Sequence, residues 1–261
     1  MNLNVEIYGA GAPLILIHGW GMHGGMWGEM LEKLAQHYTV HSVDLPGHGK
    51  SAHIAPYDLD ALVASVSAYV RQNNFAQPLT VCGWSLGGQV ALRWAQHAPE
   101  QVCKIILLAS TPCFVQRDGW EYAMPSATFH AFEQDLQQGT ERTLKRFIAL
   151  QVRGSERERE CLAHLRGSLF GRGVPQQAAL RDGLVILRET DLRALLPYIT
   201  QPVLVIAGDR DELVPIAAAE YLTQHMPNAR MLQIKGAAHV PFLSHPDELV
   251  MQLKKFMDYP Q

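Results

Sequence analysis

The stretch LTVCGWSLG, residues 79–87, joins a short apolar run to a turn built of glycine and serine. Residues 79–82 predict a buried strand, and residues 86–95 carry apolar side chains at helical spacing. A G-x-S-x-G motif between a strand and a helix is typical of a nucleophile elbow, a turn too tight for side chains larger than glycine. The Ser85 hydroxyl is then exposed above the sheet, so we predict that Ser85 is a nucleophile rather than part of a chance turn.

Short apolar runs rich in valine, isoleucine and leucine recur on both sides of this turn. Most are nearly continuous rather than alternating, which suits strands covered on both faces of a parallel sheet. The expected strands are residues 14–17, 39–43, 79–82, 104–108, 203–207 and 230–234. Helices are expected at residues 59–70, 86–95 and 246–256. Alternating strands and helices predict an α/β fold with a mostly parallel central sheet flanked by helices.

The alternation stops between residues 112 and 188. This part of the chain is helical in character, and its helical segments are residues 129–136, 140–151 and 156–165. We predict that residues 112–188 form a helical cap inserted into a core made of residues 1–111 and 189–261. We find no internal repeat.

The composition limits the classes of function. The 261 residues are 48% hydrophobic, enough for a large core, and carry a formal net charge of −3. This balance argues against a general nucleic-acid binder, which needs a basic surface. We expect no signal peptide, because the N-terminal stretch lacks a basic segment followed by a long apolar one. No apolar run approaches the ~20 residues that cross a membrane, so no membrane association is expected.

The four cysteines, Cys82, Cys103, Cys113 and Cys161, show no C-x-x-C spacing. Cys82 and Cys103 lie in apolar runs, where a reduced and buried thiol is the ordinary interpretation. Together with the missing signal peptide, this pattern predicts a cytoplasmic protein.

A serine hydroxyl is a weak nucleophile unless a neighbouring base removes its proton. Among 12 histidines, His239 is the candidate base, because it follows the last expected strand on a loop at the edge of the sheet that carries the elbow. The base needs an acid to orient it, and Asp209 and Asp211 both follow the strand at residues 203–207. The order serine, aspartate, histidine matches that of hydrolases with a G-x-S-x-G turn.

The reaction also needs two backbone N–H groups that bind the oxyanion. We expect one from Leu86, directly after the nucleophile, and one from Trp20 in HGWG, residues 18–21. His18 and His23 together suggest a metal site, but a hydrogen bond from His18 that fixes this loop is the favoured interpretation, and no metal is expected. The loop DLPGHGKS, residues 44–51, lacks the spacing of a phosphate-binding loop and is expected to support the site.

Five stretches resemble one family of the α/β-hydrolase superfamily, the pimeloyl-[acyl-carrier protein] methyl ester esterases of biotin biosynthesis, or BioH family. They are HGWG (18–21), GWSLGG (83–88), ASTPCF (109–114), FIALQ (147–151) and AHVPF (238–242), the last followed by SHP (244–246). The third and fourth discriminate best, because they lie at the expected cap, where relatives diverge. The superfamily resemblance spans the full chain and implies an α/β-hydrolase fold with an inserted helical cap.

The resemblance also implies an activity and a set of site residues. The loop DELVP, residues 211–215, matches the place where these hydrolases carry their acid, which favours Asp211 and leaves Asp209 to hold the turn. The implied reaction splits the methyl ester of pimeloyl-carrier protein into pimeloyl-carrier protein and methanol through a Ser-His-Asp acyl-enzyme mechanism, without any cofactor. Implied substrate contacts are Trp20, Ser85, Leu86, Phe147, Ile148, Ala149, Leu150, Gln151 and His239. Trp84, Phe114 and Phe147 are expected to line an acyl pocket.

The expected cap is locally basic. Residues 140–166 hold seven basic and four acidic side chains, a net charge of +3, although the whole chain carries −3. Carrier proteins are acidic, so a basic cap would attract one. Arg142 and Arg146 are four residues apart on one helical face, and Arg159 is a further candidate for docking. The alternative is a solvated helix with Glu–Arg pairs. We expect a monomer.

Several rival functions share the same motifs. A short-chain carboxylesterase, a lactonase, a C–C hydrolase and a perhydrolase all use this triad and differ in the cap and pocket. A haloalkane dehalogenase is disfavoured, because its chemistry needs aspartate at position 85. A non-catalytic receptor on the same fold is a rival of another class, but such proteins often lose a member of the triad.

Overall fold

The computed structural model describes residues 3–75 and 78–258, so residues 1–2, 76–77 and 259–261 of the expected core lie outside the described part. A seven-stranded sheet has the order β1-β3-β2-β4-β5-β6-β7. The strands are β1 Val5–Tyr8, β2 Ala12–Ile17, β3 Tyr38–Val43, β4 Leu79–Trp84, β5 Val102–Leu108, β6 Val203–Gly208 and β7 Ala229–Ile234. Strands β2 to β7 pair in parallel, whereas β1 pairs with β3 antiparallel. The mostly parallel α/β fold is confirmed.

Strand β1 is the strand that the sequence analysis missed. It has only four residues, and none of its side chains is fully buried. Its sequence, VEIY, lacks the continuous apolar run on which the other strands were identified. The inner strands β4 and β6 are buried along their whole length, as their sequences predict.

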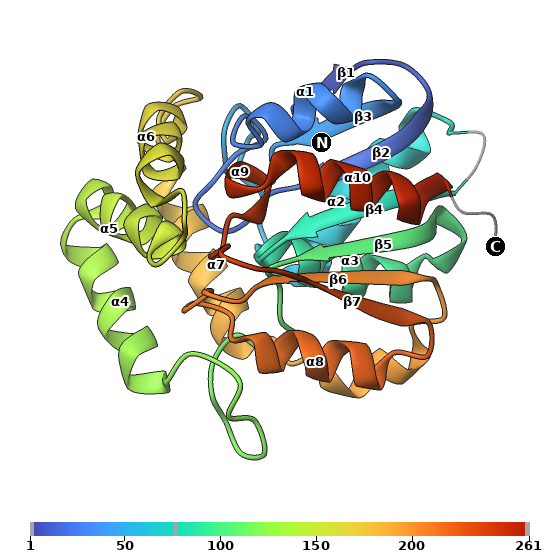
Figure 1. Cartoon of the computed structure of the whole chain (residues 1–261). Coiled ribbons are helices and arrows are strands. Elements are labelled where there is room, and N and C mark those ends of the chain that lie inside the picture. The colour runs from blue at the N-terminus through green and yellow to red at the C-terminus, as the bar shows by residue number, and fades with distance from the viewer. Residues whose placement is uncertain (1–2, 76–77, 259–261) are drawn as a thin grey trace.

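The helices of the core cover the sheet (Figure 1). They are α1 Glu29–Ala35, α2 Leu59–Gln72, α3 Leu86–His97, α8 Ile216–His225, α9 Pro241–Ser244 and α10 Pro246–Asp258. Helix α10 packs on α1 in front of the strands, whereas α2 packs on α3 behind them. The buried hydrophobic residues form one continuous core between these layers. No helix within the described ranges is long and apolar enough to pass through a membrane.

A helical insertion lies between β5 and β6. Its helices are α4 Ser126–Gln138, α5 Thr140–Val152, α6 Glu158–Ser168 and α7 Gln177–Glu189, of which α7 was not expected. They gather beyond the end of the sheet toward which the parallel strands point (Figure 1). We call α4–α7 the cap. The exact division at residues 112 and 188 stays a prediction.

Candidate active site

Ser85 occupies the turn between β4 and α3. Its backbone has φ 55° and ψ −118°, a conformation that residues other than glycine rarely adopt. The surrounding structure holds this strained residue in place: the Ser85 N–H donates to Leu108 O at 2.9 Å, and Ser110 Oγ donates to Ser85 O at 2.8 Å. The elbow is therefore fixed by the neighbouring strand β5.

The glycines of the motif are required by close contacts. A Cβ at Gly83 would lie 2.2 Å from the carbonyl oxygen of Gly87. A Cβ at Gly87 would lie 2.1 Å from the carbonyl oxygen of Ile17, the last residue of β2. Real Cβ atoms essentially never approach a backbone atom so closely, so larger residues would push the elbow away from the loop that follows β2.

His239 and Asp211 are brought together by the loops after β7 and β6. His239 Nδ1 lies 2.8 Å from Asp211 Oδ2, and both side chains are 1% exposed. The other oxygen, Oδ1, accepts the backbone N–H groups of Leu213 and Val214 at 2.9 and 3.0 Å. A carboxylate only accepts hydrogen bonds, so Nδ1 carries the proton and Nε2 is free to accept one. Nε2 is buried and has no partner among the described residues.

Three further contacts hold the histidine loop. Trp84 Nε1 donates to the carbonyl oxygen of His239 at 2.9 Å, and the Gln151 carbonyl, at the end of α5, accepts the His239 N–H at 3.0 Å. Asp209 Oδ1 accepts the Gly236 N–H at 2.7 Å, a contact within the turn that precedes His239. Asp209 thus contacts the turn and not the imidazole.

Two backbone amides beside Ser85 are the candidate donors of the oxyanion hole. The N–H groups of Trp20 and Leu86 have no acceptor among the described residues. Leu86 is the first residue of α3, whose N-terminal N–H groups have no partner within the helix. A Cβ at Gly19 would lie 3.1 Å from Ser85 Cβ, so the loop that carries Trp20 passes directly beside the serine.

Two buried histidines hold this loop. His18 Nε2 accepts the Leu45 N–H at 2.9 Å, so its Nδ1 donates to Gly19 O at 2.8 Å. His48 Nε2 accepts the Gly21 N–H at 3.3 Å. Burial is the largest cause that lowers the pKa of His18 to about 3 and that of His48 to about 4. Both rings are therefore neutral at pH 7, as these accepting contacts require.

His18 and His23 do not form a metal site. His23 Nε2 contacts the carbonyl oxygen of Ser168 at 2.8 Å, and its Nδ1 accepts the Gly25 N–H at 3.0 Å. With both ring nitrogens of both histidines engaged, neither has a lone pair left for a metal ion. Within residues 3–75 and 78–258, no group of His, Cys, Asp or Glu side chains has the arrangement of a metal site.

An apolar cavity opens beside Ser85, under the cap. Its lining comprises Trp20, Ser85, Phe114, Met124, Thr128, Phe129, Phe132, Phe147, Leu150, Leu184, Leu187 and Leu213. Ser85 and Thr128 supply the hydroxyl groups of this lining. The cavity has a volume of about 60 Å³. Leu150 is 38% exposed and marks the side of α5 that reaches the surface.

The predicted substrate residues fall into two groups. Phe147 and Leu150 line the cavity, as does Phe114. Ile148 is buried in the core, and Gln151 contributes its carbonyl group to the histidine loop. Ala149 does not line the cavity either. A helix turns successive side chains by about 100°, so a run of five residues cannot all face one cavity.

Trp84 lies behind the histidine loop rather than in the cavity. Its ring packs against Trp27, Phe242 and His239, with centroids 6.1, 4.8 and 5.9 Å away. The Trp84 ring thus supports the loop that carries the imidazole. The strand β4 continues through residue 84, and this explains why a residue beside the nucleophile points away from the cavity.

The predicted docking arginines are exposed on the cap. Arg142 and Arg146 lie on α5, and Arg159 lies on α6. Arg146 pairs with Asp135 at 2.6 Å, whereas Arg142 and Arg159 make no ion pair with any described residue. The alternative of internally paired helices is supported for Arg146, and also for Lys145 and Arg157, which pair with Glu141 at 2.6 Å and Glu160 at 3.9 Å.

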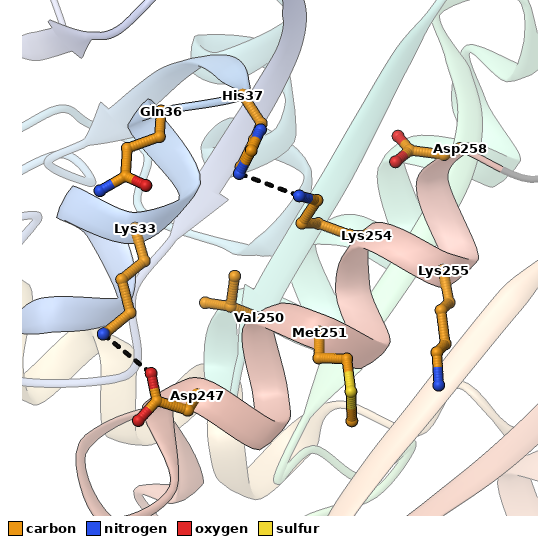
Figure 2. A pocket seen from close by; sticks show the side chains of 9 residues that line it. All are labelled: Lys33, Gln36, His37, Asp247, Val250, Met251, Lys254, Lys255 and Asp258. Carbon is orange, nitrogen blue, oxygen red and sulfur yellow. Dashed lines mark hydrogen bonds and ion pairs between the residues drawn. The ribbon is translucent and has the colours of Figure 1, made fainter.

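A second hollow, about 790 Å³, is a groove between α1 and α10 (Figure 2). Its charged side chains pair across the groove: Lys33 contacts Asp247 at 2.8 Å, and Lys254 contacts His37 at 2.9 Å. None of Ser85, Asp211 and His239 lines it. We therefore take the smaller apolar cavity as the candidate active site, because it contains the nucleophile.

Comparison with known proteins agrees with this architecture. A family model described as alpha/beta hydrolase fold matches residues 12–246. The esterase EaEST from Exiguobacterium antarcticum superposes with a TM-score of 0.90 at 26% identity, over 98% of this chain and 96% of that chain. A bromoperoxidase from Bacillus anthracis, 23% identical, has the same fold with a TM-score of 0.90, over 98% and 95% of the two chains. The fold and site thus define an α/β hydrolase.

Curated relatives narrow this class. A protein of Nitrosomonas europaea named pimeloyl-[acyl-carrier protein] methyl ester esterase is 43% identical over 95% of this chain and 97% of its own length. A protein of the same name from Xanthomonas campestris pv. campestris is 42% identical over 98% of both chains. The chain belongs to this esterase family of the α/β hydrolases.

Proposed function

We propose that this protein hydrolyses the methyl ester of pimeloyl-[acyl-carrier protein] to pimeloyl-[acyl-carrier protein] and methanol, a step of biotin biosynthesis. It is a serine carboxylic ester hydrolase. The observation that carries the chemistry is the imidazole of His239, held at 2.8 Å by Asp211 with its Nε2 unpartnered, at the sheet edge that bears the strained Ser85. The names of the curated relatives supply the substrate.

The mechanism follows from these positions. Ser85 Oγ attacks the ester carbonyl while His239 Nε2 takes its proton, and Asp211 stabilises the imidazolium. The amides of Trp20 and Leu86 bind the oxyanion, and such donors contribute roughly 3 kcal/mol each at the transition state. The carbon–oxygen bond to the methoxy group then breaks, and the methoxy oxygen takes the proton from His239. Water, activated by the same base, hydrolyses the acyl-enzyme and restores Ser85.

The apolar cavity supports an acyl chain as the bound part of the substrate. Its lining of phenylalanine and leucine side chains matches methylene groups, and Thr128 is its one hydroxyl apart from the nucleophile. The cavity, of about 60 Å³, would take the part of the acyl chain next to the ester. The rest of the chain, and the thioester beyond it, would leave along Leu150 toward the surface of α5.

The basic surface of α5 and α6 supports docking of an acidic carrier protein. We infer that Arg142 and Arg159, which have no internal ion pair among the described residues, bind carrier carboxylates, and that Arg146 exchanges Asp135 for one. A cytoplasmic monomer without nucleic-acid or membrane contacts completes the proposal. The four free cysteines are in keeping with a reducing compartment.

The test combines a purified substrate with genetic rescue. Wild-type protein should release methanol from pimeloyl-carrier methyl ester and restore growth without biotin in a strain that lacks its own pimeloyl methyl esterase. The Ser85→Ala variant should lose at least a factor of about 10³ in kcat and fail to rescue. Turnover of p-nitrophenyl acetate without carrier-ester hydrolysis or rescue would leave a general short-chain carboxylesterase. Undiminished turnover by Ser85→Ala would refute the mechanism.

A further inference from the structure

The side chain of Trp20 reaches from the loop after β2 into the cap. Its indole is 2% exposed, and Nε1 donates to the carbonyl oxygen of Leu180, in α7, at 2.9 Å. The ring also packs edge-on against Phe132 of α4 and Phe147 of α5, with centroids 5.4 and 5.2 Å away. The residue proposed to bind the oxyanion through its amide is thus held through its side chain by three cap helices.

Gly183 lies where this indole meets α7. It is a buried residue inside a 13-residue helix, where glycine is less favourable than alanine by roughly 1 kcal/mol. Its φ is not positive, so the backbone itself does not call for glycine. A Cβ at this position, however, would lie 2.7 Å from Trp20 Cδ1 and 3.0 Å from Trp20 Nε1. The missing side chain therefore makes room for the indole.

We propose that Gly183 is a positioning residue for the oxyanion hole, because the notch it leaves in α7 seats the Trp20 indole and thereby sets the place of the Trp20 amide. The inference rests on the proposed function of that amide. The indole is closed in by Phe132, Phe147 and Leu180, so it cannot move aside without moving its own backbone. Gly19, next to Trp20, lies against Ser85, so such a shift reaches the reacting atoms.

The first test compares two alanine substitutions in cap helices. Gly183→Ala adds a methyl group against the indole, whereas Gly167→Ala adds one in α6 where nothing lies within 4 Å. With p-nitrophenyl acetate, whose acetyl group is too short to need the acyl cavity, Gly183→Ala should lower kcat by about tenfold or more with little change in KM. Gly167→Ala should match the wild type. Equal kcat values for Gly183→Ala and the wild type would overturn the proposal.

A second readout reports on the oxyanion hole itself. A trifluoromethyl ketone accepts Ser85 Oγ at its carbonyl carbon and becomes a hemiketal oxyanion, while the serine proton passes to His239. Its inhibition constant should rise in Gly183→Ala by about the same factor as kcat falls, since both depend on binding the oxyanion. A fall in kcat with an unchanged inhibition constant would assign Gly183 a structural role only.

A third variant changes Trp20, the partner of Gly183 in this contact. Trp20→Ala keeps the amide but removes Cδ1 and Nε1, the indole atoms that meet position 183. In this background, Gly183→Ala should cost less than about twofold in kcat, because the clash is gone. A tenfold loss there as well would contradict the proposal. If Gly183→Ala alone does not fold, Trp20→Ala still tests the idea: a wild-type kcat and inhibition constant would refute positioning through the indole.

These experiments are separable from the test of the substrate. Wild-type turnover of pimeloyl-carrier methyl ester decides the proposed function. The ratio of kcat between Gly183→Ala and the wild type on p-nitrophenyl acetate decides the role of Gly183, whatever the natural ester is.

Discussion

The loops at the carboxyl ends of β4, β6 and β7 differ from the cap in what holds them. Backbone hydrogen bonds and glycine contacts fix Ser85, Asp211 and His239, and these residues are 5%, 8% and 1% exposed. The cap is held by aromatic packing and by exposed ion pairs such as Arg146–Asp135. The triad is therefore held largely by main-chain contacts, whereas the cap is held by side chains that can change while the fold is kept.

The largest effect should come from breaking the acid–base contact. Asp211→Asn should lower kcat on p-nitrophenyl acetate by about 10⁴-fold, because an amide no longer fixes the Nδ1–H tautomer of His239. Asp209→Asn, two residues earlier, is the matched control and should stay within about tenfold of the wild type, since Asp209 contacts only the Gly236 N–H. The reverse order of losses would make Asp209 the acid.

Removing a positive charge from the cap should cause a smaller loss of activity, and only with the carrier-linked ester. Arg142→Ala should raise KM for carrier-linked ester by about tenfold, with no change on p-nitrophenyl acetate, because it removes a charge from the docking surface. Arg146→Ala should have less effect, since Arg146 is already paired with Asp135. Arg230→Ala, at the start of β7, controls for net charge. Equal losses on both esters would contradict docking on α5.

The smallest effect concerns stability and pH. Burial lowers the pKa of His18 to about 3 and of His48 to about 4, below the value near 6.5 of an unfolded histidine. Between pH 6.5 and 4 the unfolded chain binds more protons at these two positions than the folded chain does, so the free energy of unfolding falls as the pH falls. Above pH 7.5 this effect is absent.

Urea unfolding at pH 7.5 and pH 5 measures this slope. His48→Gln keeps an acceptor for the Gly21 N–H but does not titrate, so the difference in unfolding free energy between the two pH values should shrink. His130→Gln, on the exposed surface of α4, is the control for removing a histidine outside the core. An unaltered slope in His48→Gln would show that other groups cause the acid sensitivity.

Much of the core was predictable because its signals are local. The elbow needs a strand, two glycines and a helix in direct succession, and the sequence around Ser85 contains all of them. The parallel strands were identified because burial on both faces demands continuous apolar runs. Their ends place His239 and both aspartates on one edge, whereas the choice of Asp211 over Asp209 came from the family resemblance.

The rest depends on contacts between distant segments. Nothing near residue 48 indicates that His48 holds the Gly21 amide, and nothing near residue 183 indicates that an indole from residue 20 fills the notch there. The sequence analysis did not predict α7 as a separate helix, although its apolar residues have helical spacing. It predicted only a generally helical character for that part of the cap. Residues 147–151, the predicted substrate stretch, do not all line the cavity: some of their side chains lie in the core. The face that each residue presents depends on how α5 is rotated about its axis.

The hydrogen bond from the His239 N–H to the Gln151 carbonyl has a consequence for chain exchange between relatives. Helix α5, which carries Arg142 and Arg146, ends where the Gln151 carbonyl accepts the N–H of His239. A chimera with the cap of a relative, even one with a well-formed pocket, would have a different end of α5. The loop that carries His239 would then lose or change its contact with that end. Caps of this family should therefore be transplantable only together with the junction after Val152, and homologous recombination should tolerate crossovers in α4 better than at that junction.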